Sequence, residues 1–255
     1  MKRSANGIRL TMFAAVVAGF AGPSLGADPA GWSYTGANGP AKWGKLSKDF
    51  VHCGTGAMQS PIDIPDKDVR KGDLPALLFN YKPSQLRIVD DGRTLQINYA
   101  PGSWLSVAGK LYELVAITLH KPSEEKINGR GQEMSAHFIH KDKDGKVMIL
   151  AELLDQGAEN PLIKALWSNL PPAKGKEHAV DAVTINAFAL LPQTKGYYMY
   201  TGSLTTPPCT ENVTWYVLKT PGTVSADQVA RFGRLYPASA RPIQARNDRD
   251  IVGTP

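Results

Sequence analysis

Two histidines and a threonine form the one pattern in this chain that points to metal chemistry. His120 and His137 each close or occupy an apolar stretch, and Thr118 stands two residues before His120. Side chains two residues apart on a β-strand share a face, so a histidine pair at that spacing can bind one ion. A catalytic zinc site usually has three protein ligands and one water. The sequence supplies two imidazoles and, at the third position, a hydroxyl.

Two predicted strands would position these residues. The segments 111–120 and 135–140 have the apolar content of strands, and His137 would share a face with Ser135 and Ile139. In the first segment, the alternation predicts one face made of Leu111, Val115, Ile117 and Leu119, and another made of Ala116, Thr118 and His120. Neighbouring strands would therefore bring His120 and His137 together.

Other residues compete for the missing ligand position. His140 lies three residues after His137, so strand alternation predicts that it faces the opposite way, as a core histidine satisfied by hydrogen bonds. His52 and His178 lie in polar surroundings and are predicted at the surface. Glu152 interrupts an apolar run, which indicates an edge position or a buried carboxyl paired with a basic residue. Its use as a replacement ligand is an alternative that no sequence feature supports.

The first 27 residues have the layout of a secretory signal peptide. Three basic residues precede the apolar run Met12–Ala21, and small residues follow it. The apolar run is too short to span a bilayer comfortably, although an uncleaved anchor is the alternative. We therefore expect a signal peptide over 1–27 and one large domain over 28–255, periplasmic or secreted and free of the membrane after cleavage.

Charge and cysteine content limit the possible functions further. The formal charge of +6 includes three basic and no acidic residues of the leader, which leaves 6 − 3 = +3. This surplus is spread through runs of mixed sign such as Lys141–Lys146, so we expect no nucleic-acid partner. In an oxidising compartment, the only two cysteines, Cys53 and Cys209, favour a disulfide, the alternative being two separate buried thiols.

The remaining elements predict a mixed α/β, mainly β, single domain with a large, mostly antiparallel twisted sheet and few peripheral helices. Asn160 before Pro161 is typical of a helix start, here for 162–170, and Ser225 with Gln228 forms a capping-box pattern for a second helix. The segment 241–251 has no periodicity and is predicted to be an ordered loop or edge segment. The predicted strands are 85–89, 95–99, 103–107, 111–119, 135–140, 147–154, 180–185, 197–203 and 213–219.

Several longer motifs carry a resemblance to a known family. The motifs are Trp32-Ser-Tyr34, Gln59-Ser60-Pro61-Ile62, Pro122-Ser123-Glu124, Met134…His137-Phe138-Ile139-His140 and Gly202-Ser203-Leu204-Thr205-Thr206-Pro207-Pro208-Cys209-Thr210-Glu211. Together they resemble the α-class carbonic anhydrases of bacteria over almost the whole chain from Trp32 to Ile251. The resemblance implies a zinc-dependent reversible hydration of CO2 to bicarbonate, in which bound water loses a proton near neutral pH and attacks CO2.

The resemblance also assigns roles to residues of this sequence. It implies His120 and His137 as two of three zinc ligands, Thr205 as the residue that orients the zinc-bound hydroxide, and Glu124 as the carboxylate behind Thr205. An alternative is that Thr205 and Glu124 persist only as a buried hydrogen-bonded pair. The implied CO2 pocket consists of Ile139, Ile149, Leu204, Thr206, Val213 and Trp215.

The departures from the family pattern fall at the same site. Thr118 replaces the first zinc histidine, Ala116 replaces the amide side chain that would orient it, and Ser135 replaces the glutamate that would orient the third histidine. Arg93 stands at the proton-relay position, and Glu125 stands at a position that is commonly histidine. If one ligand carries about a quarter of a typical zinc-binding free energy, its loss removes ~3 kcal/mol or more, at least ~100-fold in affinity.

Three functions follow from these expectations. The first is an exported protein whose CO2 hydration is lost or strongly impaired, with zinc weakly bound or absent, and whose cleft binds a small molecule, glycan or protein. The second is an active but slow carbonic anhydrase acting on CO2 and bicarbonate. The third is a weak esterase that uses whatever metal remains.

Overall fold

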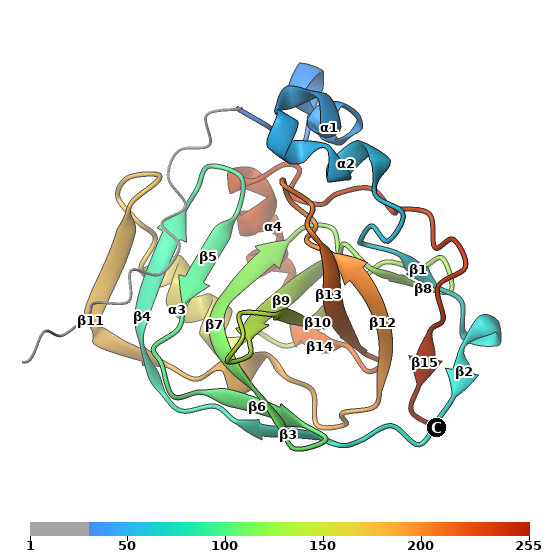
Figure 1. The fold of residues 1–255 in the computed structure, drawn as a ribbon. Coiled ribbons are helices and arrows are strands. Elements are labelled where there is room, and N and C mark those ends of the chain that lie inside the picture. Colours follow the sequence, from blue (N-terminus) through green and yellow to red (C-terminus); the bar gives the residue numbers. More distant parts are fainter. Residues whose placement is uncertain (1–30) are drawn as a thin grey trace, which may run out of the picture.

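The architecture is that of one large twisted sheet (Figure 1). The structure is a computed structural model that describes residues 31–255, so the signal peptide expected over 1–27 lies outside the described residues. Within them, thirteen strands form the main sheet, and a further pair, β1 and β8, forms a small parallel sheet. Most neighbouring strands are antiparallel, with β10 and β13 as a parallel pair near the centre. No helix of the described residues is long and apolar enough to cross a bilayer.

The strands take the following bounds. They are β1 (Asp63–Ile64), β2 (Arg70–Lys71), β3 (Leu77–Asn80), β4 (Ser84–Asp90), β5 (Leu95–Asn98), β6 (Trp104–Val107), β7 (Lys110–His120), β8 (Lys126–Ile127), β9 (Met134–Lys141), β10 (Val147–Gln156), β11 (Glu177–Ile185), β12 (Tyr197–Ser203), β13 (Glu211–Leu218), β14 (Gly222–Val224) and β15 (Val252–Gly253). The central order is β11-β4-β5-β7-β9-β10-β13-β12-β15-β2.

The two faces of the central strands bury different sets of side chains. On β9, Met134, Ala136 and Phe138 belong to the main core, which also contains Met148 and Leu150 from β10. The alternate residues point the other way, where a second apolar cluster gathers Ile149, Ala151, Val213 and Trp215 with Ile139 against it. Because side chains alternate along a strand, Ser135 and His137 lie on the face of this second cluster, as the sequence predicted.

The predicted alternation of β7 is wrong in its first half. A register irregularity interrupts the pairing with β9 between Leu114 and Ala116, so Val115 is an extra residue in the strand. The main core therefore receives Tyr112 and Leu114 before the irregularity, and Ile117 and Leu119 after it. Leu111, which was expected on the buried face, is 55% exposed. A bulge of one residue has no sequence signature in this stretch.

Two longer helices cover the main core, and both begin as the sequence predicted. In α3 (Pro161–Ser168), the Asn160 side chain accepts hydrogen bonds from the amides of Leu162 and Ile163. In α4 (Ala226–Leu235), the capping box of Ser225 and Gln228 is formed in both directions. Their buried side chains join the main core, so both helices pack on the sheet face opposite to His137.

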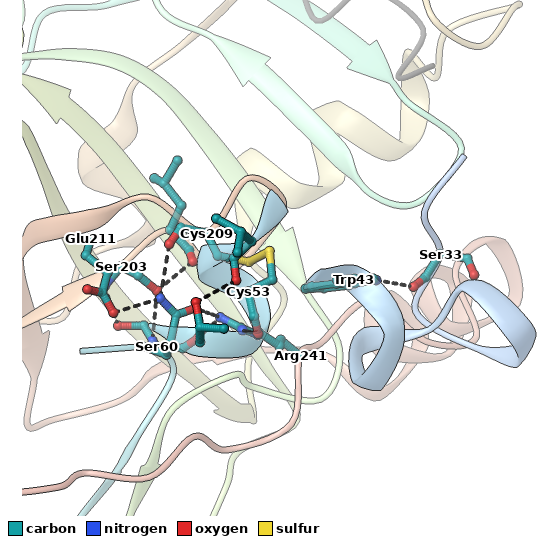
Figure 2. The surroundings of a disulfide bond; sticks show 12 residues. Ser33, Trp43, Cys53, Ser60, Ser203, Cys209, Glu211 and Arg241 are labelled. Carbon is teal, nitrogen blue, oxygen red and sulfur yellow. Dashed lines mark hydrogen bonds between the residues drawn. A yellow bond between two sulfur atoms is a disulfide. The ribbon is translucent and has the colours of Figure 1, made fainter. Parts of the chain in front are cut away.

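Short helices and a disulfide organise the N-terminal part of the described chain. These are α1 (Trp43–Leu46), α2 (His52–Thr55) and the 3-10 turns η1 (Gly36–Asn38), η2 (Pro40–Lys42) and η3 (Lys48–Phe50), while η4 (Asp66–Asp68) and η5 (Ala187–Leu190) lie farther along. A third apolar cluster joins Trp32, Tyr34, Trp43 and the disulfide between Cys53 and Cys209. Figure 2 shows this disulfide beside Arg241. The predicted disulfide is thus confirmed, and the alternative of two free thiols is wrong.

The nine predicted strands are all present, with ends that differ by up to three residues. The sequence did not predict β3, the two- and three-residue strands or the short N-terminal helices, because their local patterns are too brief to stand out. The segment predicted to lack periodicity, 241–251, contains no helix or strand.

Candidate metal centre

The two histidines converge as the sequence predicted. His120 ends β7 and His137 lies in the middle of β9, and pairing of these strands sets Thr118 opposite His137. The imidazole ring centroids are 4.5 Å apart. Both histidines are 2% exposed, so the pair is almost completely enclosed by protein. Thr118 is half-buried beside them.

The two nitrogens of His120 have different partners. Nδ1 lies 2.7 Å from the carbonyl oxygen of Ser239, which can only accept, so Nδ1 carries the proton. Nε2 therefore has a free lone pair, and the Thr118 hydroxyl, 3.0 Å away, donates to it. Burial, together with the neighbouring His137, holds the pKa of His120 well below its ordinary value. This imidazole is a neutral base whose ligand atom is hydrogen-bonded to Thr118.

His137 lies between two buried carboxylates. Its Nε2 is 3.1 Å from Oε2 of Glu125, and its Nδ1 is 3.6 Å from Oε2 of Glu124. Burial by itself lowers the pKa of His137, but the two carboxylates, Glu125 foremost, outweigh burial and leave it raised. Since Nε2 donates to Glu125, the nitrogen with a free lone pair in the neutral ring is Nδ1.

Glu124 connects the histidines to the C-terminal segment. One oxygen, Oε1, accepts from the backbone amide of Arg241 at 2.6 Å. The other oxygen, Oε2, is buried without a hydrogen-bond partner among the described residues. Burial is the main reason that the pKa of Glu124 rises to about 7. The neighbouring Thr205 hydroxyl acts in the opposite direction and lowers the pKa of this carboxyl group.

The donor set matches part of a zinc site. His120, Glu124 and His137 are the one group among residues 31–255 whose nitrogen and carboxylate atoms lie close enough to hold a metal ion together. However, Glu124 is 3.6 Å from Nδ1 of His120, a nitrogen already bonded to Ser239. The free atoms are Nε2 of His120 and Nδ1 of His137. They fit two zinc ligands, whereas the neutral hydroxyl of Thr118 does not fit the third.

The residues implied for the CO2 pocket gather beside His137. Ile149, Val213 and Trp215 are buried in the second apolar cluster, and Ile139 and Leu204 pack against it. The edge of the Trp215 ring meets His137 with centroids 5.0 Å apart. Thr205 is buried and Thr206 is half-buried in the turn after β12. The structure thus places the predicted apolar wall on the face of the sheet that carries His137.

Arg93 contacts the N-terminal segment of the described chain. Its guanidinium carbon lies 4.0 Å from the ring centroid of Trp32, and its Nε donates to the Trp32 carbonyl at 3.1 Å. Asp91 contributes a second, weaker contact at 3.8 Å. A guanidinium does not release its proton near neutral pH, so the residue at the predicted relay position is a structural anchor for Trp32.

The other candidate ligands lie elsewhere. His140 is buried on the opposite face, with Nε2 2.7 Å from the Tyr81 hydroxyl and Nδ1 2.9 Å from the Phe138 carbonyl, as predicted. Burial lowers the pKa of His140 to about 3. His52 is exposed, as expected, whereas His178 is half-buried in β11 rather than fully at the surface.

Glu152 faces the main core and is no replacement ligand. It is fully buried opposite Ala136, on the side of β10 away from His137. The sequence suggested an edge position, which is wrong, or a buried carboxyl paired with a basic residue, of which only the burial is confirmed. The strand is central, no ion pair involves Glu152 among the described residues, and Oε1 accepts instead from the Gly222 amide. Burial raises the pKa of Glu152 to about 9.

Three contributors to the site escaped the sequence analysis. The Ser239 carbonyl and the Arg241 amide come from a segment without periodicity, so nothing local marks them. The Arg241 side chain is 3% exposed and donates to Gln59 Oε1 and to the carbonyls of Ser60 and Cys53 (Figure 2). Glu125 was noticed only as a departure, and its contact with His137 depends on how the loop between β7 and β8 folds back.

Fold and site together define a carbonic-anhydrase-type scaffold, and comparison with known proteins agrees. The model of the eukaryotic-type carbonic anhydrase family matches residues 38–253. The carbonic anhydrase of Neisseria gonorrhoeae is 40% identical over 223 residues, covering 87% of each chain. That of Nostoc sp. is 39% identical over 224 residues, covering 87% of this chain and 85% of its own. This chain belongs to the α-carbonic anhydrase family.

Solved structures show the same fold. The α-carbonic anhydrase of Thermovibrio ammonificans, in complex with the inhibitor sulfanilamide, has a TM-score of 0.83 and 35% identity, covering 87% of this chain and 98% of that one. Dioscorin in complex with ascorbate has a TM-score of 0.81 and 29% identity, covering 88% and 97%.

Proposed function

We propose that this protein is an exported member of the α-carbonic anhydrase family in which hydration of CO2 is lost or strongly impaired, and whose active-site cleft has a binding role. The observation that carries the proposal is the hydrogen bond from Thr118 to Nε2 of His120. A metal ion and a hydroxyl proton compete for the same lone pair, so zinc has to displace the hydroxyl before it binds.

The chemistry of the site supports the same conclusion. When bound, zinc would lower the pKa of a water ligand and so supply the nucleophile. Two imidazoles and a hydroxyl bind that ion less tightly than three imidazoles, by roughly 3 kcal/mol on the reckoning that each ligand carries about a quarter of the binding free energy. Glu124 and Thr205 remain placed to orient a reactant, and the apolar wall remains beside His137. The apolar residues beside His137 are therefore present although the set of metal ligands is incomplete.

The test measures zinc directly. Protein purified without chelator is analysed for zinc content, and its affinity is determined by competition with a chromophoric chelator. We expect substoichiometric zinc in the native protein and an affinity at least ~100-fold tighter in Thr118→His, which completes the ligand set. Thr118→Val is the matched control, because it removes the hydroxyl at similar volume without adding a ligand, and its affinity should stay within a few-fold of native.

Stopped-flow CO2 hydration then measures the activity. The native protein should be slow or inactive, and Thr118→His should recover part of the rate. Full zinc occupancy with rapid hydration by the native protein would overturn the proposal.

One observation favours a second candidate, a slow but genuine carbonic anhydrase. The outer nitrogens of both histidines keep hydrogen-bond acceptors, Ser239 for His120 and Glu125 for His137. These contacts leave a lone pair on Nε2 of His120 and on Nδ1 of His137, both on the side of the metal centre. The two remaining ligands are therefore preorganised. Measurable zinc-dependent hydration, abolished by chelator, would favour this candidate, and p-nitrophenyl acetate hydrolysis would test the accompanying weak esterase activity.

The binding role and the location are tested separately. The fold neighbour dioscorin, crystallised with ascorbate, supports the idea that a cleft of this fold accepts a small organic molecule. Equilibrium dialysis with ascorbate, bicarbonate and simple sugars examines this role. The disulfide supports export to an oxidising compartment. Fractionation of cells expressing the full-length chain should place it in the periplasm or medium, with the leader removed.

A further inference from the structure

The family resemblance implies that the residue at position 135 orients the third histidine. In this chain Glu125, and not Ser135, contacts His137. Ser135 lies two residues before His137 on the same face of β9, where a carboxylate was expected. Its hydroxyl instead accepts the backbone amide of Glu124 at 3.2 Å. The short serine side chain thus fixes the loop after β7 and leaves the outer nitrogen of His137 to another residue.

Glu125 supplies the missing carboxylate from that loop. Its Oε2 lies 3.1 Å from Nε2 of His137, and the residue is fully buried. Its own carbonyl accepts the Ser123 hydroxyl at 3.0 Å, which fixes the backbone from which the carboxylate projects. A buried N–H to carboxylate hydrogen bond is among the stronger kinds, because the acceptor is charged and water is excluded.

We infer that Glu125 is the positioning residue of His137: its carboxylate accepts a hydrogen bond from Nε2–H and thereby fixes the tautomer whose Nδ1 lone pair points into the metal centre. The inference deepens the proposed function, since it concerns the same site, but it holds whether or not the protein hydrates CO2. The position of the carboxylate has moved from strand to loop, and its contact with the ring is kept.

The arrangement also concentrates negative charge beside one ring. Glu125 contacts one nitrogen and Glu124 approaches the other at 3.6 Å. Oε2 of Glu124 and Oε1 of Glu125 are both buried without hydrogen-bond partners among the described residues. Unpartnered buried oxygens are stabilised by a hydrogen-bond donor or a cation, so Glu125 supports metal binding as well as ring orientation.

The first experiment reads the tautomer in metal-free, full-length protein. Long-range ¹H–¹⁵N correlation spectra of the histidine rings distinguish Nε2–H from Nδ1–H, and the native protein should show Nε2–H for neutral His137. Glu125→Ala should give a mixture of tautomers. Ser135→Ala is the matched control and should leave the Nε2–H tautomer unchanged, because Ser135 does not contact the ring and the Ser123 hydroxyl still holds the Glu125 carbonyl. An unchanged tautomer in Glu125→Ala would overturn the inference.

The second experiment uses cobalt(II) affinity in the Thr118→His background, read from its visible absorption. Adding Glu125→Ala should weaken binding ~10–100-fold, the usual effect of losing an outer-sphere partner. Adding Ser135→Glu to that double variant should restore most of the loss, whereas Ser135→Glu without Glu125→Ala should give no gain. Absence of both the loss and the rescue would contradict the inference.

A milder variant covers the case in which Glu125→Ala does not fold. Glu125→Gln keeps the size and an acceptor oxygen but removes the charge. We expect it to keep the Nε2–H tautomer and to weaken cobalt(II) affinity by ~5-fold or more. Unchanged affinity would count against Glu125. Because the tautomer is measured without metal, a failed tautomer test refutes the role of Glu125, and a failed zinc or hydration test refutes the proposed function.

Discussion

The Thr118 hydroxyl donates a hydrogen bond to Nε2 of His120 across 3.0 Å. The direction of this bond follows from the other side of the ring, where Nδ1 donates to the Ser239 carbonyl. A residue in place of a metal ligand thus satisfies the atom that the metal would have bound. Three of the four ring nitrogens of the histidine pair thus have a hydrogen-bond partner, and Nδ1 of His137 lies 3.6 Å from Oε2 of Glu124.

The first prediction concerns stabilisation by zinc. A ligand that binds only the folded state stabilises by RT ln(1 + [L]/Kd), which is about 2.7 kcal/mol at 100 times Kd and ~0.4 kcal/mol at Kd. At a zinc concentration about 100 times the Kd of Thr118→His, a native protein with ~100-fold weaker affinity should gain only ~0.4 kcal/mol of stability. Differential scanning calorimetry with and without zinc measures the difference. Equal shifts in the two proteins would contradict it, and Thr118→Val should behave as the native protein does.

The second prediction concerns the buried carboxyl of Glu152. Folding raises its pKa from 4.5 to about 9, so its contribution to stability is complete below pH ~4.5 and is lost as the pH rises toward 9. At about 1.4 kcal/mol per pH unit, the loss is at most ~6 kcal/mol. Urea unfolding at pH 5, 7 and 9 measures the free energy of unfolding of both the native protein and Glu152→Gln. The value for Glu152→Gln should rise relative to that of the native protein as the pH rises. Parallel pH profiles would show that this carboxyl ionises freely in the fold.

The third prediction concerns Arg93 as an anchor. Its guanidinium covers the Trp32 ring and bonds the Trp32 carbonyl, contacts worth ~1–2 kcal/mol together. Arg93→Ala should lower the free energy of unfolding by that amount, and Arg93→Lys should recover only part of it because an ammonium lacks the planar fork. Neither change should alter zinc affinity in the Thr118→His background. A large effect on affinity would place Arg93 in the metal centre instead.

The fourth prediction concerns the disulfide. Cys53 and Cys209 are 156 residues apart in sequence, and the Cys53 carbonyl accepts from Arg241, whose own amide bonds Glu124. Loss of the bond in Cys53→Ser/Cys209→Ser should lower the free energy of unfolding by ~2–5 kcal/mol. The chain of contacts further predicts a shift in the Glu124 and Arg241 backbone resonances. Stability within 1 kcal/mol of native would contradict the prediction.

Much of the fold was predictable because long strands and capped helices carry their information locally. The Asn160 and Ser225 caps and the alternation of β9 are examples, and the convergence of His120 with His137 followed from that alternation. The gathering of the apolar wall beside His137 followed from the family resemblance.

Contacts made by loops could not be predicted from the sequence. The bond between Glu125 and His137 needs the chain to turn back after β7, and the Ser239 and Arg241 contacts need a segment without periodicity to pass beside the histidines. The orientation of Glu152 was within reach, since it shares its parity with Met148 and Leu150, but a charged residue in a core position contradicts the usual preference.

The extra residue at Val115 determines on which face of the sheet the imidazole of His120 lies. With uninterrupted alternation from Leu114, His120 would project among the hydrocarbon side chains beneath α3 and α4, far from His137. Regular pairing of Val115 with Ile139 would therefore turn the second half of β7 inside out. One apolar residue thus separates the histidine-bearing face of this strand from the face that packs in the main core.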